Sequence, residues 1–176
     1  MNTDEFGKLF ETFRSSAFRL ETLPEYRVPQ DVESLRLFRE GQPPPESRRE
    51  RPWLQTIRNA KARSARMQRV RVIRGALTEY QRFQFAWGYP DNLAAGEDIR
   101  ILDRDVPGLL SEDYWLFDDA LVVRLDYDDE GRFLRPVVVD DVVPCRRCRD
   151  VALTHAVPFS DYLTRTEDRP SLSRPH

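Results

Sequence analysis

Six short apolar segments along the chain predict β-strands. In 68–75, Val70 and Val72 alternate with arginine, and this period of two is typical of a half-buried strand. Residues 129–131, Asp-Glu-Gly, form a turn sequence between the last two segments, which therefore pair as a hairpin. Pro136 cannot donate a backbone hydrogen bond, so the last strand lies at a sheet edge or carries a bulge. The predicted strands cover 17–22, 68–75, 97–102, 114–118, 121–127 and 132–140.

Apolar residues at spacings of three and four predict helices around these strands. One such face joins Trp53, Ile57, Ala60, Ser64 and Met67, and it predicts a single helix over 53–67. Further helices are predicted over 4–15, 32–39, 78–86, 93–95 and 142–163.

Proline and glycine mark the expected breaks between elements. The three prolines of 41–47 exclude a helix or a central strand there, so this segment is expected to be a loop. Thr78 is expected to cap the helix that follows it, and Gly88 and Pro90 are expected to end that helix. Pro158 is expected to interrupt the last helix.

The order of the elements predicts an α+β (or α/β) fold. N-terminal helices are followed by strand–helix–strand and a C-terminal meander, which together form a mixed sheet of four to six strands packed by helices. A chain of 176 residues fits a single domain, which we place at 1–163, followed by a polar tail, 164–176, that we expect to be disordered. No stretch of about 18 apolar residues and no signal-peptide pattern is present, so we expect a cytoplasmic protein that does not bind membranes.

The sequence lacks the patterns of common catalytic sites. Its seven glycines form no phosphate-binding loop, and neither His155 nor His176 belongs to a recognisable catalytic pattern. Cys145 and Cys148 have the spacing of a redox pair or of half a zinc site, but no second pair accompanies them. We interpret them as two small residues one helical turn apart, and we expect no catalytic residue, no metal site and no cofactor.

Positive charge gathers in 48–71, which holds nine basic residues against Glu50 alone, although the whole chain has a net charge of −2. A solvated outer face, paired with the protein's own acids, is one interpretation. The other is a docking surface for a protein partner or a nucleic acid, although a pI of about 5.8 disfavours nucleic acid. On the predicted helix, the candidate partner-binding residues lie roughly opposite the apolar face: Arg51, Arg58, Arg66 and Arg69.

A second group of polar residues lies at the ends of predicted strands and helices, where ligands gather in open sheets. These residues either line one ligand pocket or form a buried network of salt bridges that stabilises the fold. The ligand-binding candidates are Tyr80, Arg82, Glu97, Asp98, Arg100, Arg104, Trp115 and Asp118.

Several segments resemble an actinobacterial family of domains of unknown function, over about 6–162. The resemblance implies proximity to helix-turn-helix regulators, because members are often encoded beside them. Residues 70–118 are similar to the ligand- or partner-binding half of some such regulators, which is distantly phospholipase-D-like in fold but lacks the catalytic residues. The matching segments are AFRLETLPEY, RPWLQTIR, QRVRVI, TEYQRFQF, NLAAGEDIRILDR, DYWLFD and AVPFSDYL.

These observations favour a non-catalytic regulatory accessory protein. It would bind a protein partner, for example a DNA-binding transcriptional regulator such as a helix-turn-helix protein, and also a small ligand. One alternative is an enzyme acting on a phosphate-containing or nucleic-acid substrate, with Arg82, Arg100 and Arg104 holding the anion and Glu97 or Asp98 as metal ligand or base. Another is direct nucleic-acid binding through the arginine-rich helix.

Overall fold

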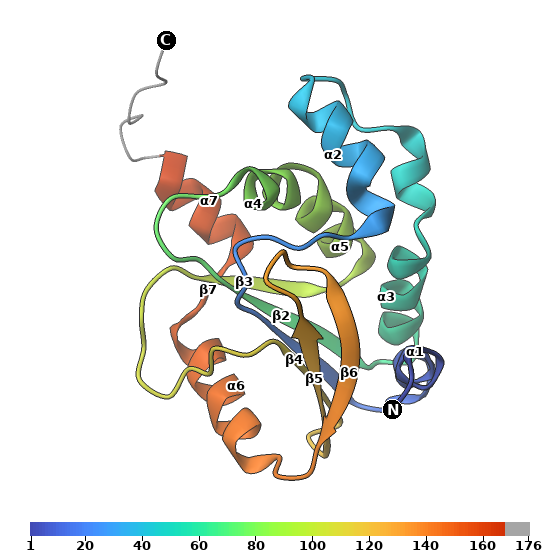
Figure 1. Cartoon of the computed structure of the whole chain (residues 1–176), viewed down its shortest axis with the longest axis vertical. Coiled ribbons are helices and arrows are strands. Elements are labelled where there is room, and N and C mark those ends of the chain that lie inside the picture. The colour runs from blue at the N-terminus through green and yellow to red at the C-terminus, as the bar shows by residue number, and fades with distance from the viewer. Residues whose placement is uncertain (168–176) are drawn as a thin grey trace.

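The computed structural model describes residues 1–167, which form one mixed seven-stranded sheet with the strand order β6-β5-β4-β1-β2-β3-β7 (Figure 1). The predicted α+β fold with a mixed sheet is confirmed. β1, β2 and β3 run parallel, and every other pair of neighbours is antiparallel. The strands are β1 Ser16–Glu21, β2 Arg66–Val72, β3 Asp98–Leu102, β4 Tyr114–Phe117, β5 Leu121–Tyr127, β6 Phe133–Val139 and β7 Val157–Pro158.

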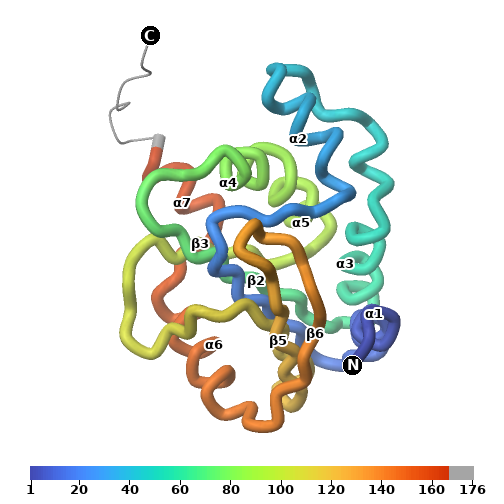
Figure 2. Tube along the Cα trace, in the orientation of Figure 1, coloured from blue at the N-terminus to red at the C-terminus, as the bar shows by residue number. Residues whose placement is uncertain are grey.

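Helices cover both faces of the sheet (Figures 1 and 2). α6 lies on one side, and α1 and α3 lie on the other, where α3 also contacts α5. Three short turns of helix, η1 Pro29–Asp31, η2 Glu46–Glu50 and η3 Gln84–Gly88, connect the longer elements. The helices are α1 Thr3–Thr12, α2 Val32–Arg39, α3 Pro52–Ala62, α4 Glu79–Phe83, α5 Tyr89–Ala95, α6 Val143–His155 and α7 Phe159–Glu167.

The two faces of the central strands differ in chemistry. On the face covered by α6, the side chains are apolar, for example Phe18 and Leu20 of β1 beside Val70 and Val72 of β2. On the opposite face, the same two strands combine apolar side chains at one end with charged side chains at the other. Because side chains alternate along a strand, each strand contributes to both the apolar face and the charged face.

The prediction of one helix over 53–67 is wrong. α3 ends at Ala62, and Ser64 adopts a left-handed backbone conformation with φ of 61°. Met67 instead lies in β2, opposite Ala17 of β1. Met67 is buried in the core cluster that contains α3 residues such as Ile57, so an apolar pattern continues across two different elements.

One predicted break is placed differently. Gly88 and Pro90 do not end the helical segment, because η3 is a π-helical turn that leads directly into α5, where Pro90 occupies a position that needs no backbone donor. Thr78 caps α4 as expected, in a reciprocal capping box with Gln81. Pro158 interrupts the last helical segment as expected, because it lies between α6 and α7. It belongs there to β7, a short edge strand that the sequence did not indicate.

The predicted hairpin and edge strand are confirmed. β6 lies at the edge of the sheet, with Pro136 opposite Leu125, and Gly131 takes φ of 79° in the turn. A Cβ at Gly131 would lie 2.5 Å from the carbonyl oxygen of Glu25, so the turn also needs glycine to approach that segment.

The C-terminal helix α7 continues to Glu167, past residue 163, and 168–176 of the expected tail lie outside the described residues. Within the described part of the chain, no helix is long and apolar enough to cross a membrane.

Candidate functional site

Four charged side chains share the face of β1 and β2 that points toward α3 and α5. Arg19 pairs in register with Arg69, and Glu21 pairs with Arg71. All four are at most 8% exposed. Four ionisable groups on one buried face are costly unless their hydrogen bonds are satisfied, so their partners define the chemistry of this region.

Most of this charge is compensated by carboxylates within the protein. Arg69 forms ion pairs with Glu21 and with Glu97, the latter at 2.8 Å. The Tyr89 hydroxyl donates to Glu21 at 2.8 Å, and the Asn92 amide donates to Glu97 at 2.8 Å. The network therefore ties the ends of β1 and β2 to α5.

The pKa of Glu21 records the strength of this compensation. Burial alone would raise it, but the guanidinium groups of Arg69, Arg71 and Arg19 outweigh burial and lower the pKa to about 2. Glu21 is therefore a carboxylate at neutral pH, held as a structural counter-ion.

Asp113 performs the same role beside β4. It accepts hydrogen bonds from Arg19 at 2.7 Å, from the Tyr26 hydroxyl at 2.5 Å, and from both the backbone and the hydroxyl of Thr22. Arg71 donates to the carbonyl oxygen of Leu23 at 2.5 Å. The segment after β1 is thereby fixed to the charged face.

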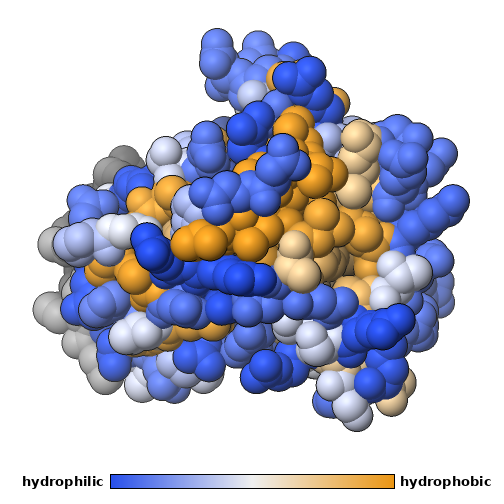
Figure 3. Space-filling model, turned by 90° about the horizontal axis from the view of Figure 1, so that it is seen from below, coloured by the Kyte–Doolittle hydropathy of each residue, from blue (hydrophilic) through white to orange (hydrophobic). Residues whose placement is uncertain are grey.

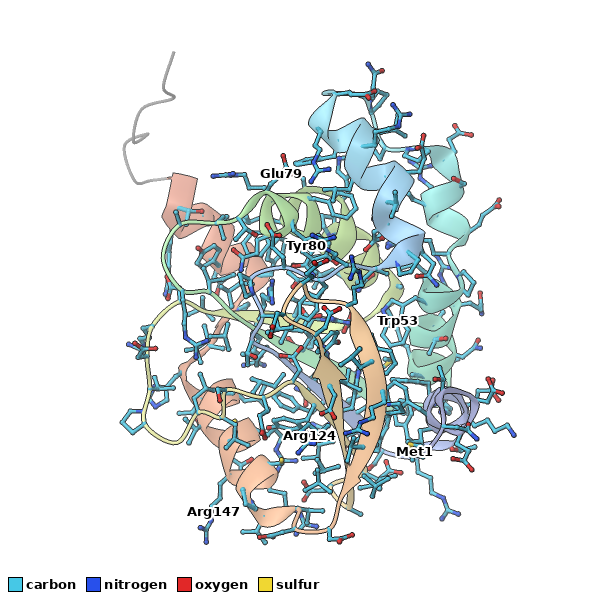
Figure 4. The ribbon with its side chains drawn as sticks, in the orientation of Figure 1. Met1, Trp53, Glu79, Tyr80, Arg124 and Arg147 are labelled. Carbon is cyan, nitrogen blue, oxygen red and sulfur yellow. The ribbon has the colours of Figure 1, made fainter. Side chains whose placement is uncertain are left out.

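A cavity of about 430 Å³ opens between this network and the helices. Its lining comes from β1, β2, η1, η2, α3, α4, η3 and α5. Figure 4 labels Tyr80 of α4 and Trp53 of α3, which belong to two different helices at its border. The residues on which its chemistry depends are Glu21, Asp31, Arg48, Arg51, Trp53, Arg69, Tyr80, Phe83, Gln84, Tyr89 and Asn92.

Arg48 is the cavity residue whose charge is least compensated. It is 4% exposed, and all three guanidinium nitrogens lack a hydrogen-bond partner within the described residues. Its guanidinium carbon lies 5.2 Å from the ring centre of Phe83 and 5.6 Å from that of Trp87, and its nearest carboxylate, Asp91, is 3.7 Å away. Burial lowers the pKa of Arg48, because the charged form is poorly solvated there.

Two acceptors on the same cavity are also unsatisfied. Gln84 Oε1 and Asn92 Oδ1 are buried without a donor, and the Asn92 orientation is fixed because its amide nitrogen binds Glu97. Across the described residues, seven buried side-chain polar atoms lack a partner, and five of them belong to Arg48, Gln84 and Asn92. Since buried polar groups are normally paired, this concentration marks the cavity as the candidate site.

Asp31 adds a carboxyl group at the rim. Burial raises its pKa, although Arg48, Arg51 and a hydrogen bond from the Tyr80 hydroxyl at 3.3 Å act in the opposite direction. Arg51 is engaged by Asp91 at 3.1 Å. The cavity thus combines one poorly compensated cation, Arg48, with the carboxyl groups of Glu21 and Asp31, which already have hydrogen-bond donors within the protein.

The structure brings together only some of the predicted ligand-binding residues. Tyr80 lines the cavity. Glu97 and Trp115 belong to the adjoining network, where Trp115 lies 5.9 Å below the guanidinium carbon of Arg69. Glu97 forms part of a buried network of salt bridges, which was the alternative to a ligand pocket that the sequence left open.

The other five candidates lie away from the cavity. Arg82 is exposed on α4, and Asp98 binds Arg100 in its own strand. Arg104 contacts His155 at the end of α6. Asp118 has φ of 50° in the β4–β5 turn, and its carboxylate accepts backbone hydrogen bonds from residues 14–16. Its role is therefore to hold the start of β1 to this turn. The prediction of one pocket lined by all eight residues is therefore wrong.

The four arginines predicted to bind a partner do not share the face of one helix. Arg58 is exposed on α3, but Arg51 only precedes that helix and binds Asp91. Arg66 and Arg69 belong to β2, and Arg69 is buried against Glu21 and Glu97. The reason is the end of α3 at Ala62, which removes the shared helical face.

The site residues that the sequence did not reveal are mainly Arg48, Gln84 and Asn92. Arg48 follows a proline-rich loop, and Gln84 and Asn92 lie within helical segments, where polar residues are usually exposed. The strand sequences did carry a signal of a buried polar network. AFRLE and RVRV place arginine and glutamate within strands of a parallel sheet, where both faces of a strand are usually buried.

Cys145 and Cys148 behave as small apolar residues. Both are buried in α6, in the core cluster on that face of the sheet. Burial raises the pKa of the Cys145 thiol to about 11 and also raises that of Cys148, so both are neutral thiols at physiological pH. In residues 1–167, no group of three or more His, Cys, Asp or Glu side chains is placed to hold a metal ion.

A larger and more open groove, of about 1070 Å³, has an acidic lining. Several of its carboxylates are paired with the protein's own arginines. Asp126 lies 2.8 Å from Arg124, and Glu130 lies 3.1 Å from Arg27. Because these charges are already paired, the groove is a weaker candidate than the Arg48 cavity.

A family model covers residues 4–164 and therefore nearly all of the elements described above. The chain belongs to the DUF6879 family. This family is described as a domain of unknown function, so membership identifies the fold family without assigning an activity. A comparison with curated proteins finds no match. The candidate function of this DUF6879 protein therefore rests on the geometry of the cavity.

Proposed function

We propose that this DUF6879 protein is a non-catalytic regulatory protein whose cavity binds a small anionic ligand. The single observation that carries this proposal is the concentration of unpartnered buried polar atoms on Arg48, Gln84 and Asn92. A guanidinium without acceptors and two amide oxygens without donors form the complement of a polar molecule.

A binding role is favoured over catalysis by the state of the surrounding groups. Glu21 and Glu97 are bound by Arg69, and the hydroxyl of Tyr89 donates to Glu21. These groups hold one another in place, so none of the three is free to act as a nucleophile or base. The arginines of the enzyme alternative, Arg82, Arg100 and Arg104, do not line the cavity.

The proposal is tested by a thermal-shift screen of a broad library of small metabolites. A ligand at 100 times its Kd stabilises the folded state by about 2.7 kcal/mol, which raises Tm by several degrees. We expect at least one anionic compound to raise the Tm of the wild-type protein and not that of Arg48→Met. Arg49→Met, an exposed neighbour in the same turn of helix, serves as the matched control and should respond like the wild type. A library without any Arg48-dependent binder would contradict the proposal.

We also propose that the regulatory role involves a protein partner, consistent with the resemblance to proteins encoded beside helix-turn-helix regulators. The edge of β6 is the favoured surface, because among the described strands β6 pairs only with β5, and it exposes Leu134 at 60% and Val138 at 41%. An extended segment of a partner can add a strand to such an edge. Figure 3 shows that the molecule also gathers apolar side chains in the middle of one face, bounded by hydrophilic ones.

The partner proposal is tested by affinity capture with matched variants. We expect a stoichiometric protein to be retained at high salt by the wild type and by Leu93→Lys, an exposed apolar position on α5. The same protein should be lost with Leu134→Lys, because a charge at the edge of a strand opposes strand addition. Equal capture by both variants would exclude the β6 edge. Recovery of nucleic acid alone, lost at high salt, would favour the nucleic-acid alternative instead.

A further inference from the structure

We propose that the ligand of the Arg48 cavity is a small aromatic carboxylate that also carries an N–H or O–H donor. This inference rests on the proposed ligand-binding function and specifies the chemical class that the cavity selects.

The charge of the cavity favours a ligand with one negative charge. Of its three arginines, Arg69 is bound by Glu21 and Glu97, and Arg51 is bound by Asp91, so only Arg48 lacks a hydrogen-bonded counter-ion. A carboxylate matches the planar guanidinium, which can donate two parallel hydrogen bonds to it. Glu21 and Asp31 line the same cavity and would repel the several charges of a polyphosphate.

The unsatisfied acceptors require a donor on the ligand. Gln84 Oε1 and Asn92 Oδ1 are buried and receive no hydrogen bond, so an anion that only accepts would leave both unpaired. A hydroxyl or an amino group supplies the missing proton. A carboxylate without such a group, for example a simple fatty acid, would not satisfy both ends of the site.

The remaining lining favours a planar ring. Trp53, Phe83 and Tyr89 border the cavity, and aromatic side chains hold rings through offset or edge-to-face contacts. Tyr89 and Tyr80 already donate their hydroxyl protons to Glu21 and Asp31, so each presents its ring to the cavity without an unpaired donor. A cavity of about 430 Å³ accommodates a single ring with short substituents.

The test uses isothermal titration with 4-hydroxyphenylacetate and 4-aminophenylacetate as probes. The comparison compounds each lack one feature: p-cresol and p-toluidine have no carboxylate, phenylacetate has no donor, and glycolate has no ring. We expect at least one of the two probes to bind with a Kd below about 1 mM, and its counterpart without the carboxylate to bind at least about tenfold more weakly. Arg48→Met should weaken the probe by a similar factor, whereas Arg49→Met should leave its Kd unchanged.

The failures of the two proposals are distinguishable. Absence of binding by both probes, equal binding of p-cresol or p-toluidine, or unchanged binding by Arg48→Met would overturn the ligand class. Arg48-dependent binding of inorganic phosphate or AMP in place of the probes would also overturn it, while the proposed ligand-binding function would stand. If Arg48→Met fails to fold, as judged by circular dichroism, Gln84→Leu provides the second variant and should weaken the hydroxylated probe more than phenylacetate.

Discussion

At the scale of single residues, the buried arginines divide into two kinds. Arg69 has a carboxylate on each side and is an integral part of the fold. Arg48 is equally inaccessible but has no hydrogen bond from any of its three guanidinium nitrogens in the described structure. Natural proteins retain a poorly compensated buried charge mainly where it serves a function, so the contrast separates a structural arginine from a candidate ligand-binding one.

This contrast predicts opposite effects of the same substitution on stability. Arg69→Met leaves Glu21 and Glu97 without their shared cation and should lower the free energy of unfolding by about 3–5 kcal/mol. Arg48→Met removes a desolvated charge while it keeps a side chain of similar length, and it should raise the free energy of unfolding by about 1 kcal/mol in the absence of ligand. Urea denaturation monitored by circular dichroism measures both changes.

Arg49→Met controls for the loss of a surface charge and should change the free energy of unfolding by less than about 0.5 kcal/mol. A large loss of stability in Arg48→Met would show that its stacking on Phe83 and Trp87 is structurally essential, and it would weaken the functional interpretation of this residue.

At the scale of elements, the sequence predicted the strands better than the surfaces they carry. Alternation in 68–75 indicated a strand with one polar face, and β2 is indeed a strand. Its polar face is buried, however, because Arg69 meets two carboxylates that lie 48 and 28 residues away along the chain. Arg71 donates to the backbone carbonyl oxygens of Leu23 and Pro24. Local periodicity cannot reveal such partners, so it cannot distinguish a solvated arginine from a paired one.

The end of α3 is a second case in which local periodicity was insufficient. The spacing from Trp53 to Met67 is helical, but Ser64 turns the chain and Met67 continues the apolar surface from β2. The same limit applies to the residues of the candidate site. Tyr80, which lines the cavity, follows a recognisable cap at Thr78. Arg48 comes from a short turn after three prolines that has no periodic pattern.

At the scale of the whole molecule, the charged face joins segments from both halves of the sheet. β1 contributes Glu21, β2 contributes Arg69, and Glu97 precedes β3, while Asp113 holds the segment after β1 to the start of β4. The parallel strands therefore share one electrostatic network beneath α5. Because this network depends on ionised carboxylates, the stability of the fold should depend on pH.

The loss of stability at acidic pH should follow the protonation of Glu21. Its pKa falls from an ordinary 4.5 to about 2 in the folded state, so its contribution is fully present above about pH 4.5 and is lost as the pH falls toward 2. A shift of this size corresponds to about 3 kcal/mol, and urea unfolding between pH 2 and 7 measures it. Glu21→Gln should be less stable at neutral pH and should show a flatter profile below pH 4.5.

Asp31 provides the internal control, because its pKa shifts in the opposite direction. Burial raises it, so the protonated form is favoured in the folded state and this group opposes folding as the pH rises above its ordinary range. Asp31→Asn should therefore lose stability more steeply than the wild type as the pH falls from 6 to 4. Parallel profiles for all three proteins would mean that neither carboxyl group couples to folding, and the electrostatic account of the charged face would have to be abandoned.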